Sequence, residues 1–184
     1  MVREDIYGNA PVISHTAYID TSAILIGNIV IKDNVYIGPN VVIRADEVDE
    51  NYRTGCIVIS DGVSIQDGVN INTIGNSNIE IGKNVVVFNG AIIKGNCSIG
   101  NFSTLGIKSI VFNSNIDDGC YIGINSIVEN AKIMNGMMVE HGAVINGDNV
   151  SKLLKPITKD INEMSQKIIT NSINLVTGYK FMGM

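Results

Sequence analysis

The side chains of this chain that are suited to chemistry gather in two short segments, IRADE and SIQDG. The first contains Arg44, Asp46 and Glu47, and the second contains Gln66 and Asp67. A guanidinium group can make two parallel hydrogen bonds to one carboxylate, and it suits such contacts in partly buried interfaces. Arg44 and Asp46 are therefore suited to such a contact.

Histidines and cysteines offer little for metal or nucleophile chemistry. The two histidines, His15 and His141, lie far apart in the sequence, and neither could complete a three-ligand metal site alone. The three cysteines, Cys56, Cys97 and Cys120, are widely spaced and form no CxxC or CxxH motif. We therefore predict neither a disulfide framework nor a cysteine zinc site.

An aliphatic residue recurs at every sixth position through most of the first 145 residues. A period of six matches neither an amphipathic helix nor an alternating hairpin sheet. Hexads are typical of parallel β-helices, in which three hexads make one coil and the aliphatic residue fills the interior. The four stretches of the repeat comprise Ile13, Ile19, Leu25, Ile31, Ile37 and Ile43; Ile59, Ile65 and Ile71; Ile81, Val87, Ile93, Ile99, Leu105 and Val111; and Ile116, Ile122, Val128, Ile133, Val139 and Ile145.

A second, small or aliphatic position follows four residues after many of these, and it is expected to let the chain turn inside the corner. Cys97 and Cys120 occupy it, which predicts that both are buried small hydrophobes. Glycine and asparagine, frequent in segments such as IGPN and IGNSN, tolerate the backbone conformations of corners. His15 and His141 both fall at the variable third position of a hexad, which should face outward.

Interruptions of the repeat predict where the chain leaves the coil. We expect a β-helix domain over residues 1–150, with external loops near 46–58 and 72–80. External loops are where functional residues tend to gather.

The remaining residues, 151–184, are expected to form a C-terminal helix and tail. The predicted helix starts at Pro156 and ends near Gly178. Its apolar stripe should pack along the outside of the β-helix. That stripe comprises Ile157, Ile161, Met164, Ile168 and Leu175.

Net charge and hydropathy limit the binding partners and the cellular location that we expect for this chain. Thirteen Lys and Arg against 18 Asp and Glu give a net charge of −5 without a basic cluster, which argues against nucleic acid and anionic membranes. Mean hydropathy is +0.23, but polar residues interrupt every apolar stretch well before the roughly 18 residues of a membrane span. The first ten residues, MVREDIYGNA, contain no apolar signal-peptide core, so we expect a cytoplasmic protein.

With IRADE, SIQDG, the hexads and a C-terminal helix, the chain resembles the γ-class carbonic anhydrase family over nearly its whole length. The resemblance implies an all-β solenoid plus helix: a left-handed parallel β-helix with a C-terminal α-helix on its side. It also implies a homotrimer that binds a metal between neighbouring subunits, with Arg44 and Asp46 as an intersubunit ion pair that helps the trimer to assemble. Left-handedness comes from the resemblance alone, because the usual rule for parallel crossovers predicts the opposite hand.

The family's metal-binding positions carry other residues in this chain. The resemblance places one histidine ligand five residues after the Gln-Asp pair, where this chain has Asn72. It places two more on FNGAIIKG, where this chain has Asn89 and Lys94. An amide is a weak zinc ligand, and an ammonium group must lose a proton before it can coordinate. We therefore expect no metal and no other cofactor.

The resemblance also suggests what the altered site could do. It implies that Gln66 and Glu47 stand at catalytic positions, the first orienting substrate and the second moving protons. Without zinc, water would not ionise near neutral pH. We expect instead a pocket for a small anion such as bicarbonate, formed by Lys94 and Arg44 with Asn72 and Asn89, where Asp46, Glu47 or Asp67 balances the charge of Lys94.

Two alternative functions are compatible with the same residues. One is an active metal-dependent carbonic anhydrase that uses substitute ligands, such as Asp or Glu from the loops, and binds zinc or another divalent ion. The other is a hexapeptide-repeat acyltransferase, for which His141 is the candidate general base.

Overall fold

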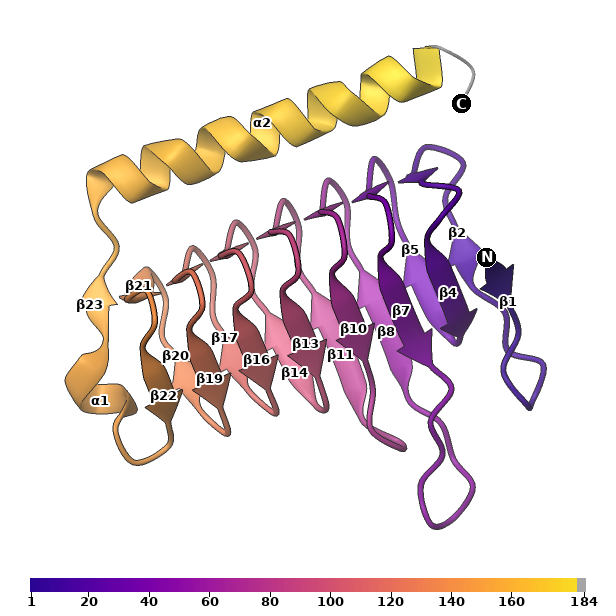
Figure 1. Ribbon diagram of the computed structural model, residues 1–184, viewed down its shortest axis with the longest axis horizontal. Coiled ribbons are helices and arrows are strands. Elements are labelled where there is room, and N and C mark those ends of the chain that lie inside the picture. The colour runs from indigo at the N-terminus through magenta and orange to yellow at the C-terminus, as the bar shows by residue number, and fades with distance from the viewer. Residues whose placement is uncertain (182–184) are drawn as a thin grey trace.

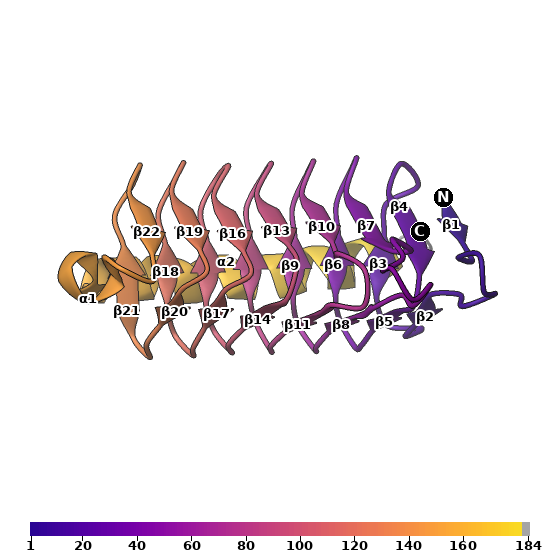
Figure 2. The same cartoon turned by 90° about the horizontal axis from the view of Figure 1, so that it is seen from below.

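The computed structural model describes residues 1–181 as a left-handed parallel β-helix flanked by one long helix (Figure 1). Three parallel sheets, here named A, B and C, form its sides. Figure 2 shows the coils stacked along one axis, with α2 running behind them. The fold predicted from the hexads and the resemblance is therefore confirmed. Residues 182–184 of the expected tail lie outside the described residues.

Each sheet takes one strand from every coil, so strands from successive coils pair in parallel. Sheet A contains β1 (Val2–Arg3), β4 (Ile24–Gly27), β7 (Val42–Ala45), β10 (Asn70–Asn72), β13 (Ile92–Lys94), β16 (Ile110–Phe112), β19 (Ile127–Glu129) and β22 (Val144–Asn146). Sheet B contains β2 (Val12–Ile13), β5 (Ile29–Ile31), β8 (Cys56–Ile59), β11 (Asn78–Ile81), β14 (Cys97–Ile99), β17 (Asn115–Ile116) and β20 (Lys132–Ile133). Sheet C contains β3 (Tyr18–Ile19), β6 (Tyr36–Ile37), β9 (Ser64–Ile65), β12 (Val86–Val87), β15 (Thr104–Leu105), β18 (Tyr121–Ile122), β21 (Met137–Val139) and the antiparallel β23 (Lys155–Pro156).

The hexad aliphatics stack into continuous columns inside the solenoid. On sheet A, Ile43, Ile71 and Ile93 are register partners on successive strands, and all three are fully buried. Burying one such side chain contributes about 1.5–3 kcal/mol. Because the side-chain period of a strand is two, the residues on either side of each buried isoleucine must face outward.

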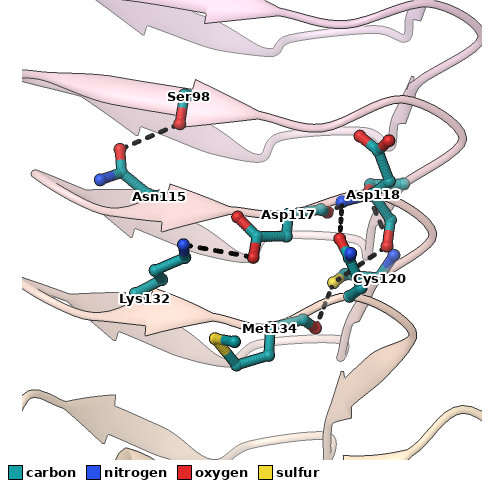
Figure 3. A network of polar contacts seen from close by, with 9 residues as sticks. Ser98, Asn115, Asp117, Asp118, Cys120, Lys132 and Met134 are labelled. Atoms are coloured by element: carbon teal, nitrogen blue, oxygen red, sulfur yellow. Dashed lines mark hydrogen bonds and ion pairs between the residues drawn. The ribbon is translucent and has the colours of Figure 1, made fainter.

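Polar side chains connect successive coils at the corners and on the outer face of sheet B. At one corner, the Asn101 amide nitrogen donates to Asp118 Oδ1, and the Asp118 amide nitrogen donates to Asn135 Oδ1. On the adjacent face, Ser98 contacts Asn115, and Lys132 pairs with Asp117 (Figure 3). These groups use their hydrogen-bonding capacity within the chain, so they reinforce the stack of coils.

Asparagine and the two buried cysteines have the structural roles expected from the repeat. Six asparagines at corners adopt positive φ, which other side chains rarely do. Cys97 and Cys120 are buried, and the Cys120 thiol points at the Met134 carbonyl oxygen, 3.1 Å away (Figure 3). The six asparagines are Asn34, Asn40, Asn84, Asn113, Asn125 and Asn130.

The chain leaves the coil most prominently between β7 and β8, where residues 46–55 form a loop that projects from the solenoid (Figure 1). A shorter connection, residues 73–77, joins β10 to β11 in the next coil. The two connections pack together, since a Cβ on Gly75 would lie 2.9 Å from the Cβ of Asp49. Contact between them holds the start of the longer loop, with Asp46 and Glu47, beside the end of sheet A.

The C-terminal helix differs in detail from the prediction. After the short α1 (Val150–Leu153), Pro156 lies in β23, and α2 runs from Lys159 to Phe181, so Gly178 lies inside it. The expected apolar stripe is wrong in part, because Met164 and Leu175 are both 42% exposed, whereas Ile157, Ile161 and Ile168 are half-buried. Small side chains let α2 approach sheet C closely, and its buried face consists of Ser165, Ile169, Ser172 and Val176.

Three stacked tyrosines attach the C-terminal end of α2 to the first coils of sheet C. The Tyr179 ring lies 4.4 Å from that of Tyr18, which in turn lies 5.5 Å from that of Tyr36. Burial, together with the neighbouring Tyr179 and Asp67, raises the pKa of Tyr36 to about 12. Ionisation of Tyr36 is therefore linked to the packing of α2.

None of the helices within residues 1–181 has the length and apolar character of a membrane span.

We expect the stability of the protein to fall between pH 10 and 12. The pKa of Tyr36 is higher in the folded chain than its ordinary value of 10, so its contribution is complete below pH 10 and is lost as pH rises toward 12. Urea unfolding followed by circular dichroism at several pH values measures this slope. Tyr36→Phe should reduce it, whereas Tyr52→Phe, in the exposed loop, should not. Equal slopes in the wild type and Tyr36→Phe would contradict the assignment.

Candidate functional site

The register of sheet A brings three predicted site residues into one outward-facing column. Arg44 pairs with Asn72, and Asn72 pairs with Lys94, on the adjacent strands β7, β10 and β13. Adjacent strands lie about 4.8 Å apart, so side chains at equivalent positions become neighbours. The three residues are 28 and 22 positions apart in the sequence and meet only because the coils stack.

A cavity of about 150 Å³ lies beside this column at the end of the sheet A strands. The column supplies Arg44, Asn72 and Lys94. The start of the projecting loop supplies the two carboxylates. The residues that line the cavity are Arg44, Asp46, Glu47, Asn72, Thr73 and Lys94.

Arg44 and Asp46 form their ion pair within one chain. The guanidinium donates from Nε and Nη2 to the two carboxylate oxygens, each over 2.9 Å. Hydrogen bonding to Asp46 raises the pKa of Arg44, so the guanidinium stays charged. Within the part of the chain that the structure describes, Lys94 has no carboxylate in ion-pair distance. Lys94 is therefore the cation of this cavity that is available to a ligand.

Two buried oxygen atoms of the cavity have no hydrogen-bond partner within residues 1–181: Asn72 Oδ1 and Thr73 Oγ1. The Asn72 Nδ2 group donates to Asn70 Oδ1 over 2.5 Å, which fixes the orientation of the amide. Thr73 is only 1% exposed. Unpaired buried polar atoms are costly, so Asn72 Oδ1, on the outward-facing column, suits a ligand that brings its own hydrogen-bond donor.

Sequence reasoning missed Thr73. The signal was present, because Thr73 follows buried Ile71 by two positions and so takes an inward direction at the end of β10. A hydroxyl at an inward position of a strand needs a partner, and its position next to Asn72 could have identified it as a site residue.

The other three predicted site residues lie along the opposite edge of sheet A. Gln66 and Asp67 connect β9 of sheet C to β10, and Asn89 connects β12 to β13. Asp67 and Asn89 are exposed and stand on successive coils, since the Gly90 amide donates to the Asp67 carbonyl oxygen. One chain therefore does not bring Gln66, Asp67 and Asn89 into the cavity of Lys94.

The two histidines are exposed, as predicted from the repeat. The carbonyl group of His15 accepts a hydrogen bond from the Lys180 ammonium group. His141 Nδ1 accepts a hydrogen bond of 2.8 Å from the Ile124 amide in the preceding coil. At another corner, the side-chain oxygens of Asn101 and Asp118 likewise accept hydrogen bonds from backbone N–H groups of the preceding coil. With Nδ1 as acceptor, the proton of neutral His141 resides on Nε2.

The cavity offers too few zinc ligands of the usual kinds: two carboxylates, of which that of Asp46 already pairs with Arg44. Zinc sites in proteins use thiolate, imidazole or carboxylate ligands, usually three or four together. Across residues 1–181, no three His, Cys, Asp or Glu side chains are grouped closely enough to hold a metal ion. Asn72 offers a weakly binding amide, and Lys94 offers a cation.

A pair of substitutions tests the structural role of His141. We expect His141→Asn to retain the free energy of unfolding, because an asparagine oxygen can accept the Ile124 amide hydrogen. His141→Ala should lower it by about 1 kcal/mol through the lost hydrogen bond. Urea unfolding at equal protein concentration measures both. A loss that is the same for asparagine and alanine would show that the bond does not matter.

Comparisons with known proteins agree with the resemblance. No protein-family model matches the chain. A carbonic anhydrase of Methanosarcina thermophila is 26% identical over 193 residues, a match that covers 94% of this chain and 76% of that protein. The carnitine operon protein CaiE of Escherichia coli is 34% identical over 109 residues, which covers 59% of this chain and about half (52%) of CaiE.

A solved structure extends the comparison to the whole fold. The hexapeptide transferase family protein of Anaplasma phagocytophilum superposes with a TM-score of 0.82 at 26% identity, over 97% of this chain and 98% of that one. The predicted resemblance is confirmed. The chain is a homologue of a carbonic anhydrase and of CaiE, and it has the β-helical fold of the hexapeptide-repeat proteins.

Proposed function

We propose that this chain forms a γ-class carbonic anhydrase-like homotrimer that binds a small anion, such as bicarbonate, and does not hydrate CO₂ with zinc. The observation that carries the proposal is the Lys94 ammonium group, which has no ion pair within residues 1–181 and shares a cavity with the unpartnered Asn72 Oδ1 atom. A cation attracts the anion, and the amide oxygen favours an anion that also donates a hydrogen bond. Bicarbonate has both properties.

The residues at the family's ligand positions explain why zinc chemistry is not proposed. By the resemblance, these positions are Asn72, Asn89 and Lys94. An ammonium group cannot replace zinc in lowering the pKa of water to near neutrality, so the hydroxide nucleophile would not form. Glu47 and Gln66 would then act in ligand binding or subunit contacts, without catalysis.

The outer surface of sheet A supports assembly into a trimer. Its outward positions form a column of apolar side chains that Asn70, between Val42 and Ile92, interrupts once, and Val144 at the end of this column is 54% exposed. The apolar surface on either side of Asn70 favours contact with another copy of the chain. The apolar members of the column are Ile24, Val42, Ile92, Ile110, Ile127 and Val144.

The two edges of sheet A explain what assembly would add to the site. Lys94 and Asn72 lie on one edge, whereas Asp67 and Asn89 lie on the other. In a threefold arrangement, one edge of each subunit faces the opposite edge of its neighbour. The partner subunit's Asn89 would then complete the cavity of Lys94, in line with the intersubunit site that the resemblance implies.

An acyltransferase is the alternative with one observation in its favour, the similarity to a hexapeptide transferase family protein. Its candidate base is His141, but a base needs a ring nitrogen that can take a proton. Nδ1 of His141 already accepts the Ile124 amide hydrogen, and Nε2 carries a proton. Acetyl-CoA binding measured by calorimetry would favour this alternative, and bound metal with CO₂ hydration above background would favour an active carbonic anhydrase.

The anion site is tested by substituting its cation. We expect Lys94→Ala to weaken bicarbonate binding by about fivefold or more, because the charge–charge attraction is lost. Glu47→Gln should strengthen binding, since it removes a carboxylate from the cavity wall. Calorimetric titration at fixed ionic strength measures both, with Lys167→Ala on the exposed face of α2 as the control. Unchanged affinity in Lys94→Ala would refute the anion site.

The assembly is tested by mass in solution. We expect a particle of three times the 19.8 kDa chain mass by light scattering. Ile110→Lys, in the apolar column of sheet A, should release monomers, whereas Val30→Lys, at an outward position of sheet B, should not. A monomeric wild type, or dissociation by Val30→Lys alone, would contradict the proposed interface.

A further inference from the structure

A second cavity lies between α2 and the corner that joins sheets C and A, and it shares no residue with the cavity of Lys94. Its volume is about 360 Å³, within the range of small-molecule sites. Ile107 and Ile124 form its wall on the solenoid, and Ile161 and Met164 form its wall on α2. The packed face of α2 begins only at Ser165, so the two α2 side chains stand beside the solenoid without being buried in it.

Two polar side chains, Tyr121 and His141, also line this cavity. Tyr121 is 4% exposed, and within residues 1–181 its hydroxyl has no hydrogen-bond partner. Burial raises the pKa of Tyr121, so the phenol keeps its proton at neutral pH and can donate it in a hydrogen bond. A hydroxyl that has no acceptor within the chain is free to donate to a ligand that enters the cavity.

His141 offers a second donor. Its Nδ1 atom is occupied as the acceptor of the Ile124 amide, so Nε2 carries the hydrogen. The imidazole ring meets the Tyr121 ring edge-on, with centroids 5.9 Å apart. Both donors therefore stand on the solenoid side of the same apolar cavity.

We propose that this cavity binds an uncharged, largely apolar molecule with one carbonyl oxygen, such as an aryl ketone or a short acyl ester, whose oxygen accepts from Tyr121 and His141. No Lys or Arg lines the cavity, so a carboxylate would be buried without a counter-charge, which is costly. An apolar cavity of about 150 Å³ can hold benzene, so 360 Å³ accommodates a ring with a short substituent. This inference does not depend on the proposed anion site.

Three fluorinated probes distinguish the expected ligand class. We expect 4-fluoroacetophenone to bind the full-length protein saturably in ¹⁹F NMR titrations. Its affinity should exceed that of 4-fluoroethylbenzene, which lacks the carbonyl oxygen, by about three- to tenfold, the effect of one net hydrogen bond. The charged 4-fluorobenzoate should bind more weakly than the ketone.

Matched variants assign the effect to the two donors. Tyr121→Phe should lower ketone affinity to that of the hydrocarbon probe without changing hydrocarbon binding, and Tyr36→Phe on the same sheet should change neither. His141→Asn, which can keep the bond to the Ile124 amide, should also weaken ketone binding selectively. The proposal is overturned if no probe binds saturably, as would occur if a neighbouring subunit fills the cavity. It is also overturned if benzoate binds best, or if Tyr121→Phe affects ketone and hydrocarbon equally.

Discussion

The in-register stacking of coils is the constraint on which the rest of this structure depends. Ile43, Ile71 and Ile93 pair on successive strands of sheet A and fill the interior. Their burial forces the next residues, Arg44, Asn72 and Lys94, to face outward as a column. A slip of one residue would turn the column inward and expose the isoleucines, so the hydrophobic core itself holds the polar residues together.

The charged side chains at the end of sheet A are paired only in part. Arg44 is engaged by both oxygens of Asp46, which comes from the start of the projecting loop. Lys94, two strands away, and Glu47 have no ion pair within residues 1–181, and Asn72 leaves a buried oxygen atom unpaired beside Lys94. Pairing one cation internally while exposing another gives the cavity its proposed preference for an anion that carries a proton.

The packing of α2 produces the second cavity. Small serine side chains bring the helix close to sheet C from Ser165 onward, and the tyrosine stack fixes its far end. Ile161 and Met164 precede the packed stretch and leave space above the corner that carries His141. The hydrogen bond that holds His141 to the preceding coil also sets its tautomer, so one backbone contact determines which chemistry this residue offers.

The amino-acid sequence by itself determined the solenoid, the buried cysteines and the outward direction of both histidines, because a hexad repeat is local and each coil repeats the same rule. The tertiary structure decided which polar residues meet. Arg44, Asn72 and Lys94 share a cavity, whereas Gln66, Asp67 and Asn89 occupy the other edge of the sheet. It also decided the packed face of α2 and the free hydroxyl of Tyr121. These features depend on side chains from different coils or from the helix, and no local pattern in the sequence records such contacts.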